Sequence, residues 1–278
     1  MSATRAERRC CVACAGTGLR NSGNAALDAA IRAYWDERIH DVELSADPPG
    51  SAAFYAALDT YRLRKNGYLL ESVGFDRWAG RDVLEIGCGA GLDLVRFARG
   101  GARTTGVDIA PRALELARGY CNVAGVGSTL LEADGACLPF GDSHFDLVYC
   151  HGVLPFARDP TAIVAESHRV LRAGGTAIFM VYNRRSWMNL ASRLARVGLG
   201  HGDAPGFRLY DRDQFASLLT PFEQIVITIE RLSPAGSAAH GIIGRIGNRG
   251  LLALGRALPE NWLRGYGWHL IAHCRKTT

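Results

Sequence analysis

The sequence has very little lysine and no long apolar run. Its basic residues are thirty arginines and two lysines, Lys65 and Lys276, and the 278-residue chain carries a net charge of +5. These residues are scattered, so the charge does not indicate a nucleic-acid partner; an arginine-rich, alanine-rich composition is typical of a GC-rich genome. No apolar run approaches the ~20 residues that span a bilayer, and no apolar core of a signal peptide follows the N-terminus. We therefore expect a cytoplasmic protein.

The eight cysteines lack a complete metal-binding pattern. Cys10, Cys11 and Cys14 have half of the spacing of a zinc site, but no matching pair of Cys or His follows nearby. The other five are scattered through predicted strands and helices, where free cysteine behaves as a small apolar residue. We predict no metal site.

The most informative feature of the sequence is a set of three glycines at every second position. Gly87, Gly89 and Gly91 follow a short apolar run, and a helical pattern and a second apolar run ending in Asp108 come next. This order of strand, tight turn, helix and strand is the first crossover of a nucleotide-binding sheet. Glycine lets the backbone turn tightly and lets a ligand approach the main chain. Asp108 comes nineteen residues after Gly89, at the predicted tip of the second strand, where a carboxylate can accept both hydroxyls of a ribose.

The glycine spacing separates two cofactor classes. A dinucleotide site has its third glycine at the position of Leu92, but here that glycine falls one residue earlier. The pattern Glu-x-Gly-x-Gly-x-Gly instead resembles motif I of class I S-adenosylmethionine-dependent methyltransferases. We expect S-adenosylmethionine as the cofactor; a nicotinamide dinucleotide and a purely structural glycine turn are the alternatives.

The resemblance is to the type 11, ubiquinone-biosynthesis-like branch, and it implies a set of cofactor-binding residues. The glycine loop and the acid before it would hold the methionine half, Asp108 the ribose and Ile109 the adenine. Asp134 and Gly135 match motif II, where the acid accepts the adenine amino group. An Asp-Gly turn and a helix N-cap are the structural alternatives for Asp134 and Asp108. The full set is Glu85, Gly87, Cys88, Gly89, Gly91, Asp108, Ile109, Asp134, Gly135 and Cys150.

Strands that alternate with helices predict an α/β fold with right-handed crossovers. With the last strand inserted antiparallel, the chain completes a seven-stranded, mostly parallel Rossmann-like sheet with helices on both faces. The expected strands are 82–86, 103–107, 128–132, 145–150, 176–182, 223–230 and 267–274. The expected domains are a disordered tail at 1–24, a helical cap at 25–74, and a methyltransferase domain at 75–278 with helical insertions at about 183–206 and 232–266.

Candidate catalytic residues lie at the carboxyl ends of strands, where open α/β sheets bind ligands, or in the first insertion. Methyl transfer depends mainly on proximity and orientation, but a hydroxyl or ammonium acceptor must also lose a proton. His151, directly after the fourth strand, is our first candidate for that base or for orienting the acceptor; a histidine bonded to loop backbone is the alternative. Tyr182 ends the fifth strand. His201 and Asp203 pair a base with a carboxylate, although a plain turn explains them more simply.

The sequence also lacks the Asn/Asp-Pro-Pro-Tyr/Phe motif after the fourth strand, where it has Cys150-His151-Gly152-Val153. This absence argues against methylation of nucleic-acid bases or of glutamine amides. We predict methyl transfer to an oxygen or nitrogen of a small, largely apolar metabolite, as in natural-product tailoring and antibiotic biosynthesis. The alternatives are carbon methylation of a quinone or lipid precursor at a membrane surface, and a non-catalytic, cofactor-binding regulatory protein.

Arginines interleave with apolar residues in both insertions, which is a basic amphipathic pattern. Such segments suit a lid over an apolar substrate, a homodimer face or a peripheral membrane contact. Packing onto the sheet with a solvated arginine face accounts for the pattern equally well.

Overall fold

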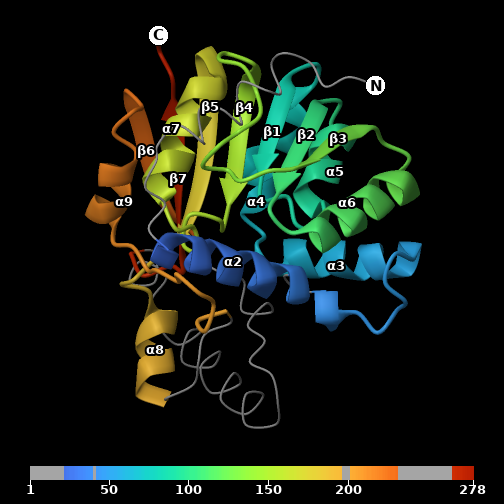
Figure 1. Cartoon of the computed structure of the whole chain (residues 1–278), viewed down its shortest axis with the longest axis horizontal. Coiled ribbons are helices and arrows are strands. Elements are labelled where there is room, and N and C mark those ends of the chain that lie inside the picture. Colours follow the sequence, from blue (N-terminus) through green and yellow to red (C-terminus); the bar gives the residue numbers. More distant parts are fainter. Residues whose placement is uncertain (1–21, 40–41, 196–200, 231–264) are drawn as a thin grey trace.

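The computed structural model describes residues 22–39, 42–195, 201–230 and 265–278, and its centre is a seven-stranded sheet with helices on both faces (Figure 1). The strand order is β3-β2-β1-β4-β5-β7-β6, and all neighbours are parallel except that β7 runs antiparallel to β5 and β6. The predicted α/β sheet with an inserted antiparallel last strand is thus confirmed. The strands are β1 Asp82–Ile86, β2 Arg103–Asp108, β3 Ser128–Glu132, β4 Phe145–His151, β5 Leu171–Tyr182, β6 Gln224–Glu230 and β7 His269–Arg275.

Capping residues in the sequence account for where several of the helices begin and end. Asp159 and Asp211 accept N–H bonds in the first turns of α7 and α9, as N-cap residues do. Helix α6 continues past Gly119, where the missing Cβ leaves room for the Tyr55 hydroxyl, and ends before Gly125, which has the left-handed conformation of a C-cap glycine. The helices are α2 Ser22–Glu37, α3 Ala52–Lys65, α4 Leu69–Val73, α5 Leu92–Arg99, α6 Pro111–Ala124, α7 Pro160–Val170, α8 Trp187–Ala195 and α9 Arg212–Leu218, with 3-10 turns η1 Val42–Leu44 and η2 Phe75–Trp78.

Two apolar layers enclose the sheet, one on each face. Alternation along β4 divides its side chains between them: Leu147 and Tyr149 pack toward α4 and α5, and Val148 and Cys150 pack toward α7 and α9. Each of these four side chains is completely buried. The sheet is therefore a rigid, doubly covered platform that fixes the positions of its strand ends.

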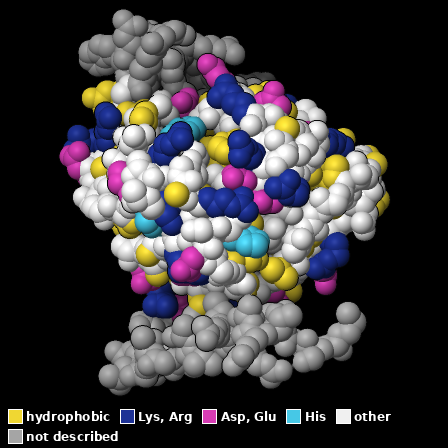
Figure 2. Space-filling model, turned by 90° about the horizontal axis from the view of Figure 1, so that it is seen from above, with side chains coloured by type: hydrophobic (Ala, Val, Ile, Leu, Met, Phe, Trp, Pro, Cys, Tyr) yellow, Lys and Arg dark blue, Asp and Glu magenta, His cyan; other side chains and the backbone are white. Residues whose placement is uncertain are grey.

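Ion pairs join the amino ends of the strands. Asp82 bonds Arg103 and Arg172, and Asp146 also bonds Arg172. The hydrogen bond from Arg103 lowers the pKa of Asp82 to about 2. Seen from the side away from α2, the surface intersperses basic and acidic side chains and gathers neither sign into one patch (Figure 2).

Helix α2 crosses the opposite edge of the sheet, beneath the carboxyl ends of the strands (Figure 1). Charged contacts attach it at two places: Arg32 bonds Glu132, the last residue of β3, and the Asp28 carboxylate accepts a 2.6 Å bond from Arg158. The helix therefore lies where the sequence places a cap, although the predicted domain boundaries stay predictions. The predicted tail up to residue 21 and nearly all of the insertion 232–266 lie outside the described residues. Among the helices that the structure describes, none combines the length and apolar character of a membrane span.

Candidate cofactor and acceptor site

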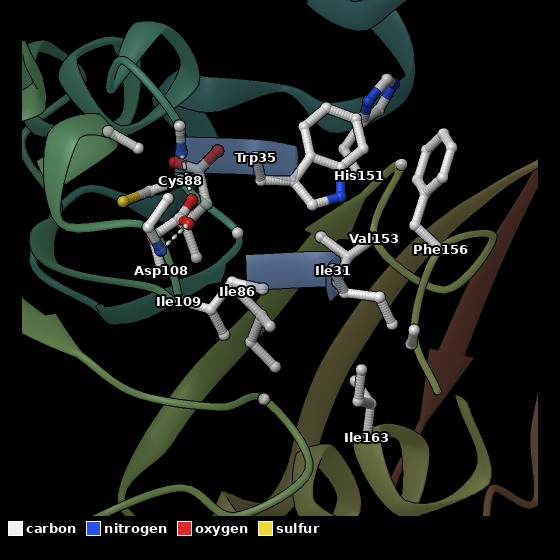
Figure 3. A pocket seen from close by; sticks show the side chains of 18 of the residues that line it. Ile31, Trp35, Ile86, Cys88, Asp108, Ile109, His151, Val153, Phe156 and Ile163 are labelled. Atoms are coloured by element: carbon white, nitrogen blue, oxygen red, sulfur yellow. Dashed lines mark hydrogen bonds between the residues drawn. The ribbon is translucent and has the colours of Figure 1, made fainter. Parts of the chain in front are cut away.

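A cavity of about 550 Å³ lies between α2 and the carboxyl ends of β1 to β5 (Figure 3). Most of the predicted site residues meet here although they come from distant parts of the sequence. Those that line it are Glu85, Gly87, Cys88, Gly89, Asp108, Ile109, Asp134, Gly135, His151 and Tyr182.

The glycine loop after β1 combines two functions of glycine. All three glycines have positive φ angles, +71° at Gly87, +54° at Gly89 and +79° at Gly91. A Cβ on Gly87 would lie 2.3 Å from Val153, and one on Gly91 would lie 3.0 Å from Ala117, so protein packing excludes a side chain at both. At Gly89 a Cβ would meet nothing within 4 Å. Gly89 is therefore the position where the loop leaves space for a ligand beside the main chain.

Asp108 is held at the end of β2 by two backbone N–H groups. Its Oδ2 accepts from Gly89 at 2.9 Å and its Oδ1 accepts from Ala110 at 2.9 Å, and burial raises the pKa of this carboxyl. The N-cap residue of α6 is Ala110, so Asp108 fixes the helix start and lines the cavity at once. Each carboxylate oxygen has a second lone pair for a ribose hydroxyl.

Asp134 likewise serves a turn and the cavity together. Its Oδ1 accepts the N–H of Ala136 at 2.9 Å, which is an Asx turn, while the residue lines the cavity beside Gly135. A Cβ on Gly135 would lie 2.7 Å from Ile86, so this glycine is required by packing.

Two buried oxygens in the cavity wall have no hydrogen-bond partner among the described residues: Glu85 Oε2 and Asn66 Oδ1. Their residues are only 4% and 2% exposed, and burial raises the pKa of Glu85 well above its ordinary value. A buried acceptor without a donor is costly, so the pair favours a ligand that brings N–H groups. The ammonium group of S-adenosylmethionine fits this requirement. Asn66 was missed by the sequence analysis, because an asparagine after a helix has no distinguishing pattern.

A charged cluster forms the wall behind Glu85. Asp93 on α5 is 1% exposed and accepts bonds from Arg62 of α3, from Arg96 at 2.6 Å and from the Tyr149 hydroxyl at 2.9 Å. Burial alone would raise the pKa of Asp93, but the two guanidinium groups outweigh it and hold this pKa well below the usual range. The cluster attaches helix α3 to the sheet and fixes one side of the cavity.

The other end of the cavity is aromatic. Trp35 of α2 packs edge-on against Phe156 at 4.8 Å between ring centroids, and Figure 3 shows both beside His151. His151 Nε2 lies 3.0 Å from the Tyr68 hydroxyl, which lies 2.6 Å from Nδ1 of His269. The sequence analysis missed Tyr68 and His269 as site residues. The predicted antiparallel last strand could have indicated His269, because such a strand begins at the edge of the sheet where the parallel strands end.

Four of the predicted site residues lie outside the cavity lining. Gly91 starts helix α5, and Cys150 is completely buried in the core toward α7. His201 and Asp203 contact α2: the Tyr34 hydroxyl lies 3.2 Å from His201 Nδ1 and donates to Asp203 at 3.0 Å, and the His201 ring centroid lies 5.1 Å from that of Trp35. The structure thus brings these two residues together but not to the cavity.

Comparison with known proteins agrees with this geometry. Residues 84–179 match the family model described as a methyltransferase domain. A ubiquinone biosynthesis O-methyltransferase from Psychrobacter arcticus is 31% identical over 171 residues, which is 60% of this chain and 62% of that protein. The chain spans about half the length of several other curated relatives it matches.

Solved structures share the fold at low sequence identity. Magnesium protoporphyrin IX methyltransferase from Synechocystis, with bound S-adenosylhomocysteine, aligns with a TM-score of 0.57 and 14% identity over 89% of this chain and 99% of that one. The [4+2]-cyclase SpnF aligns with a TM-score of 0.57 and 20% identity over 88% and 95%. The family match identifies residues 84–179 as a methyltransferase domain, and the solved structures show the fold that it shares with S-adenosylmethionine-dependent methyltransferases.

Proposed function

We propose that this protein transfers a methyl group from S-adenosylmethionine to a hydroxyl oxygen of a small, largely apolar metabolite. The observation that carries the proposal is the position of His151, which lines the same cavity as the glycine loop, at its aromatic end. One cavity thus holds the features of a cofactor site and a group able to accept a proton.

The chain's own residues prepare the transfer. The cofactor supplies an electrophilic methyl group on its sulfonium. Glu85 and Asn66 receive the ammonium group of its methionine half, and Asp108 receives the ribose hydroxyls. Helix α2 covers the cavity and excludes water, which fixes the relative orientation of methyl and acceptor. His151 takes the proton that the acceptor hydroxyl must lose as it becomes a nucleophile.

The acceptor class follows from the cavity wall and from the relatives. Trp35, Phe156, Met180 and Tyr182 give the acceptor end an apolar, aromatic surface, which suits a phenol or catechol ring. The relatives named for ubiquinone biosynthesis support oxygen methylation of a quinone precursor more than natural-product tailoring. We therefore place the protein's acceptors among apolar phenols, with antibiotic-type metabolites as the second candidate. An acceptor of this kind would be met in the cytoplasm or at a membrane surface.

Two measurements test the proposal. Calorimetric titration with S-adenosylhomocysteine tests cofactor binding, with NADH as the matched negative control. Labelled S-adenosylmethionine is then incubated with 4-methylcatechol and longer-chain alkylcatechols, and methylated product is identified by mass spectrometry. O-methylated catechol supports the proposal. Cofactor binding without turnover on any catechol, phenol or amine would favour the regulatory alternative. Turnover has to be measured as well as binding, because the same fold occurs in SpnF, which is named as a [4+2]-cyclase.

The variant His151→Ala tests the proton-accepting role of His151 independently of cofactor binding. Turnover should fall by ~10²–10⁴-fold if His151 is the general base, with unchanged S-adenosylhomocysteine affinity. Wild-type turnover in this variant would remove His151 from the mechanism and move the search to Tyr182.

A further inference from the structure

The Tyr68 hydroxyl connects two histidines that both line the acceptor end of the cavity. It lies 3.0 Å from His151 Nε2 and 2.6 Å from His269 Nδ1, while the two imidazole centroids are 5.7 Å apart. Tyr68 does not itself line the cavity. Its hydroxyl therefore reaches the acceptor region through the two imidazoles.

A hydroxyl has one proton, so Tyr68 can donate to one imidazole while it accepts from the other. We take the shorter, 2.6 Å contact as the bond that Tyr68 donates to His269 Nδ1, and the 3.0 Å contact as the bond that it accepts from His151 Nε2–H. In this tautomer the basic lone pair of His151 is on Nδ1.

Two carboxylates lie near the imidazoles, and the Arg62 guanidinium lies near Tyr68. Glu230 lies opposite His269 in the β6–β7 register, and Asp93 lies close enough to His151 for its pKa to respond to that imidazole. Burial raises the pKa of Tyr68 well above its ordinary value, so the phenol stays protonated and passes protons on. The titratable and charged groups that face the three residues are Arg62 from α3, Asp93 from α5, Tyr149 from β4, Tyr182 from β5 and Glu230 from β6.

We propose that His151, Tyr68 and His269 act as one proton-accepting unit, an inference that rests on the oxygen methylation proposed above. His151 Nδ1 takes the proton of the acceptor hydroxyl as the oxygen–methyl bond forms and the sulfur–methyl bond breaks. His151 then passes its Nε2 proton to the Tyr68 oxygen, and Tyr68 passes its own proton to His269 Nδ1. The unit gains one proton, and the charge moves from His151 to His269 beside Glu230. Tyr68 is a positioning and relay residue in this scheme.

Tyr68→Phe tests the unit, because it keeps the ring and removes the connecting hydroxyl. We expect turnover of 4-methylcatechol to fall by at least ~10-fold near neutral pH, with S-adenosylhomocysteine affinity unchanged. The pH at which turnover reaches half of its maximum should also shift. The matched control is Tyr55→Phe on α3, whose hydroxyl donates to the Leu116 carbonyl at 2.8 Å and is not part of the cavity lining. The control should lose some stability and keep the wild-type pH profile.

Titration of the histidines by NMR tests the same unit without any acceptor. In the wild-type protein, protonation of His151 and His269 should be coupled, so that each signal responds to both titration steps. Tyr68→Phe should separate them into independent curves, and Tyr55→Phe should not. Independent curves in the wild-type protein would overturn this inference even if catechols are methylated. Coupled curves with no turnover would leave the unit intact and count against the proposed reaction instead.

Discussion

Replacing Arg62 by methionine should destabilise the fold more than any exposed arginine replacement on the same helix. The Arg62 side chain is 14% exposed and makes two bonds to Asp93, through Nε at 3.2 Å and through Nη2. Methionine keeps most of the apolar stem but leaves Asp93 with only Arg96 and Tyr149 as partners. Removing one partner of a buried ion pair costs about 3–5 kcal/mol, and we expect the low end because those partners remain.

This loss of unfolding free energy can be converted into a decrease in melting temperature. In a chain of this length each kcal/mol lowers Tm by about 2 °C, so a loss of ~3 kcal/mol in Arg62→Met should lower Tm by roughly 6 °C. Arg64→Met is the control, because Arg64 is exposed on the same helix and should change Tm by about 1 °C or less. Adding Asp93→Asn to Arg62→Met should restore part of the loss, since no uncompensated charge then stays buried.

The pH dependence has a definite sign. The two arginines depress the pKa of Asp93 in the folded state. Its stabilising contribution is therefore present above the unfolded pKa of about 3.9 and is lost as pH falls through the lower folded value. Without Arg62 the folded pKa rises, so acid unfolding should begin at a higher pH. Calorimetric scans from pH 8 down to about pH 2 measure both effects. An Arg62→Met protein that melts within 1 °C of wild type would refute the structural role assigned to this pair.

Three further predictions concern the cavity and its cap. Asp108→Ala should weaken S-adenosylhomocysteine binding about ten- to a hundredfold by calorimetry, through loss of charge-assisted bonds of about 1.5–3 kcal/mol; unchanged affinity would remove Asp108 from the ribose site. Gly89→Ala should lower the free energy of unfolding by about 1–2 kcal/mol, because of the positive φ angle, and should lose most of the affinity for S-adenosylhomocysteine. Gly91→Ala should lose more stability than affinity. If the two variants lose the same stability and the same affinity, the assignment of open space to Gly89 alone is contradicted. Asp203→Asn should change stability by less than about 1 kcal/mol, because its pair with Arg38 is exposed, and a larger loss in a thermal melt would show that this contact holds α2.

Much of the fold could be read from the sequence because its signals are local. The apolar run 83–86, the glycines after it and Asp108 specify a strand, a turn and a strand within a short segment, and the structure reproduces them within a residue. Departures occurred where a distant partner intervened. The sequence predicts the fifth strand from residue 176, but β5 begins at Leu171, because residues 172–175 form a bulge between the paired residues Leu171 and Thr176. Glycine often ends a helix, but α6 continues past Gly119, where the Tyr55 hydroxyl uses the space of the missing Cβ.

The sequence by itself determined the part of the site that follows the ends of the parallel strands, because those ends place residues such as Asp108 and His151 at one edge of the sheet. Only the tertiary structure decided the rest. The antiparallel direction of β7 brings its first residue, His269, opposite Tyr182 at that same edge, and Tyr68 reaches both histidines from the connection between two helices. No short-range pattern encodes such contacts between residues that are 83 and 201 positions apart, since they exist only once the sheet and its helices are packed.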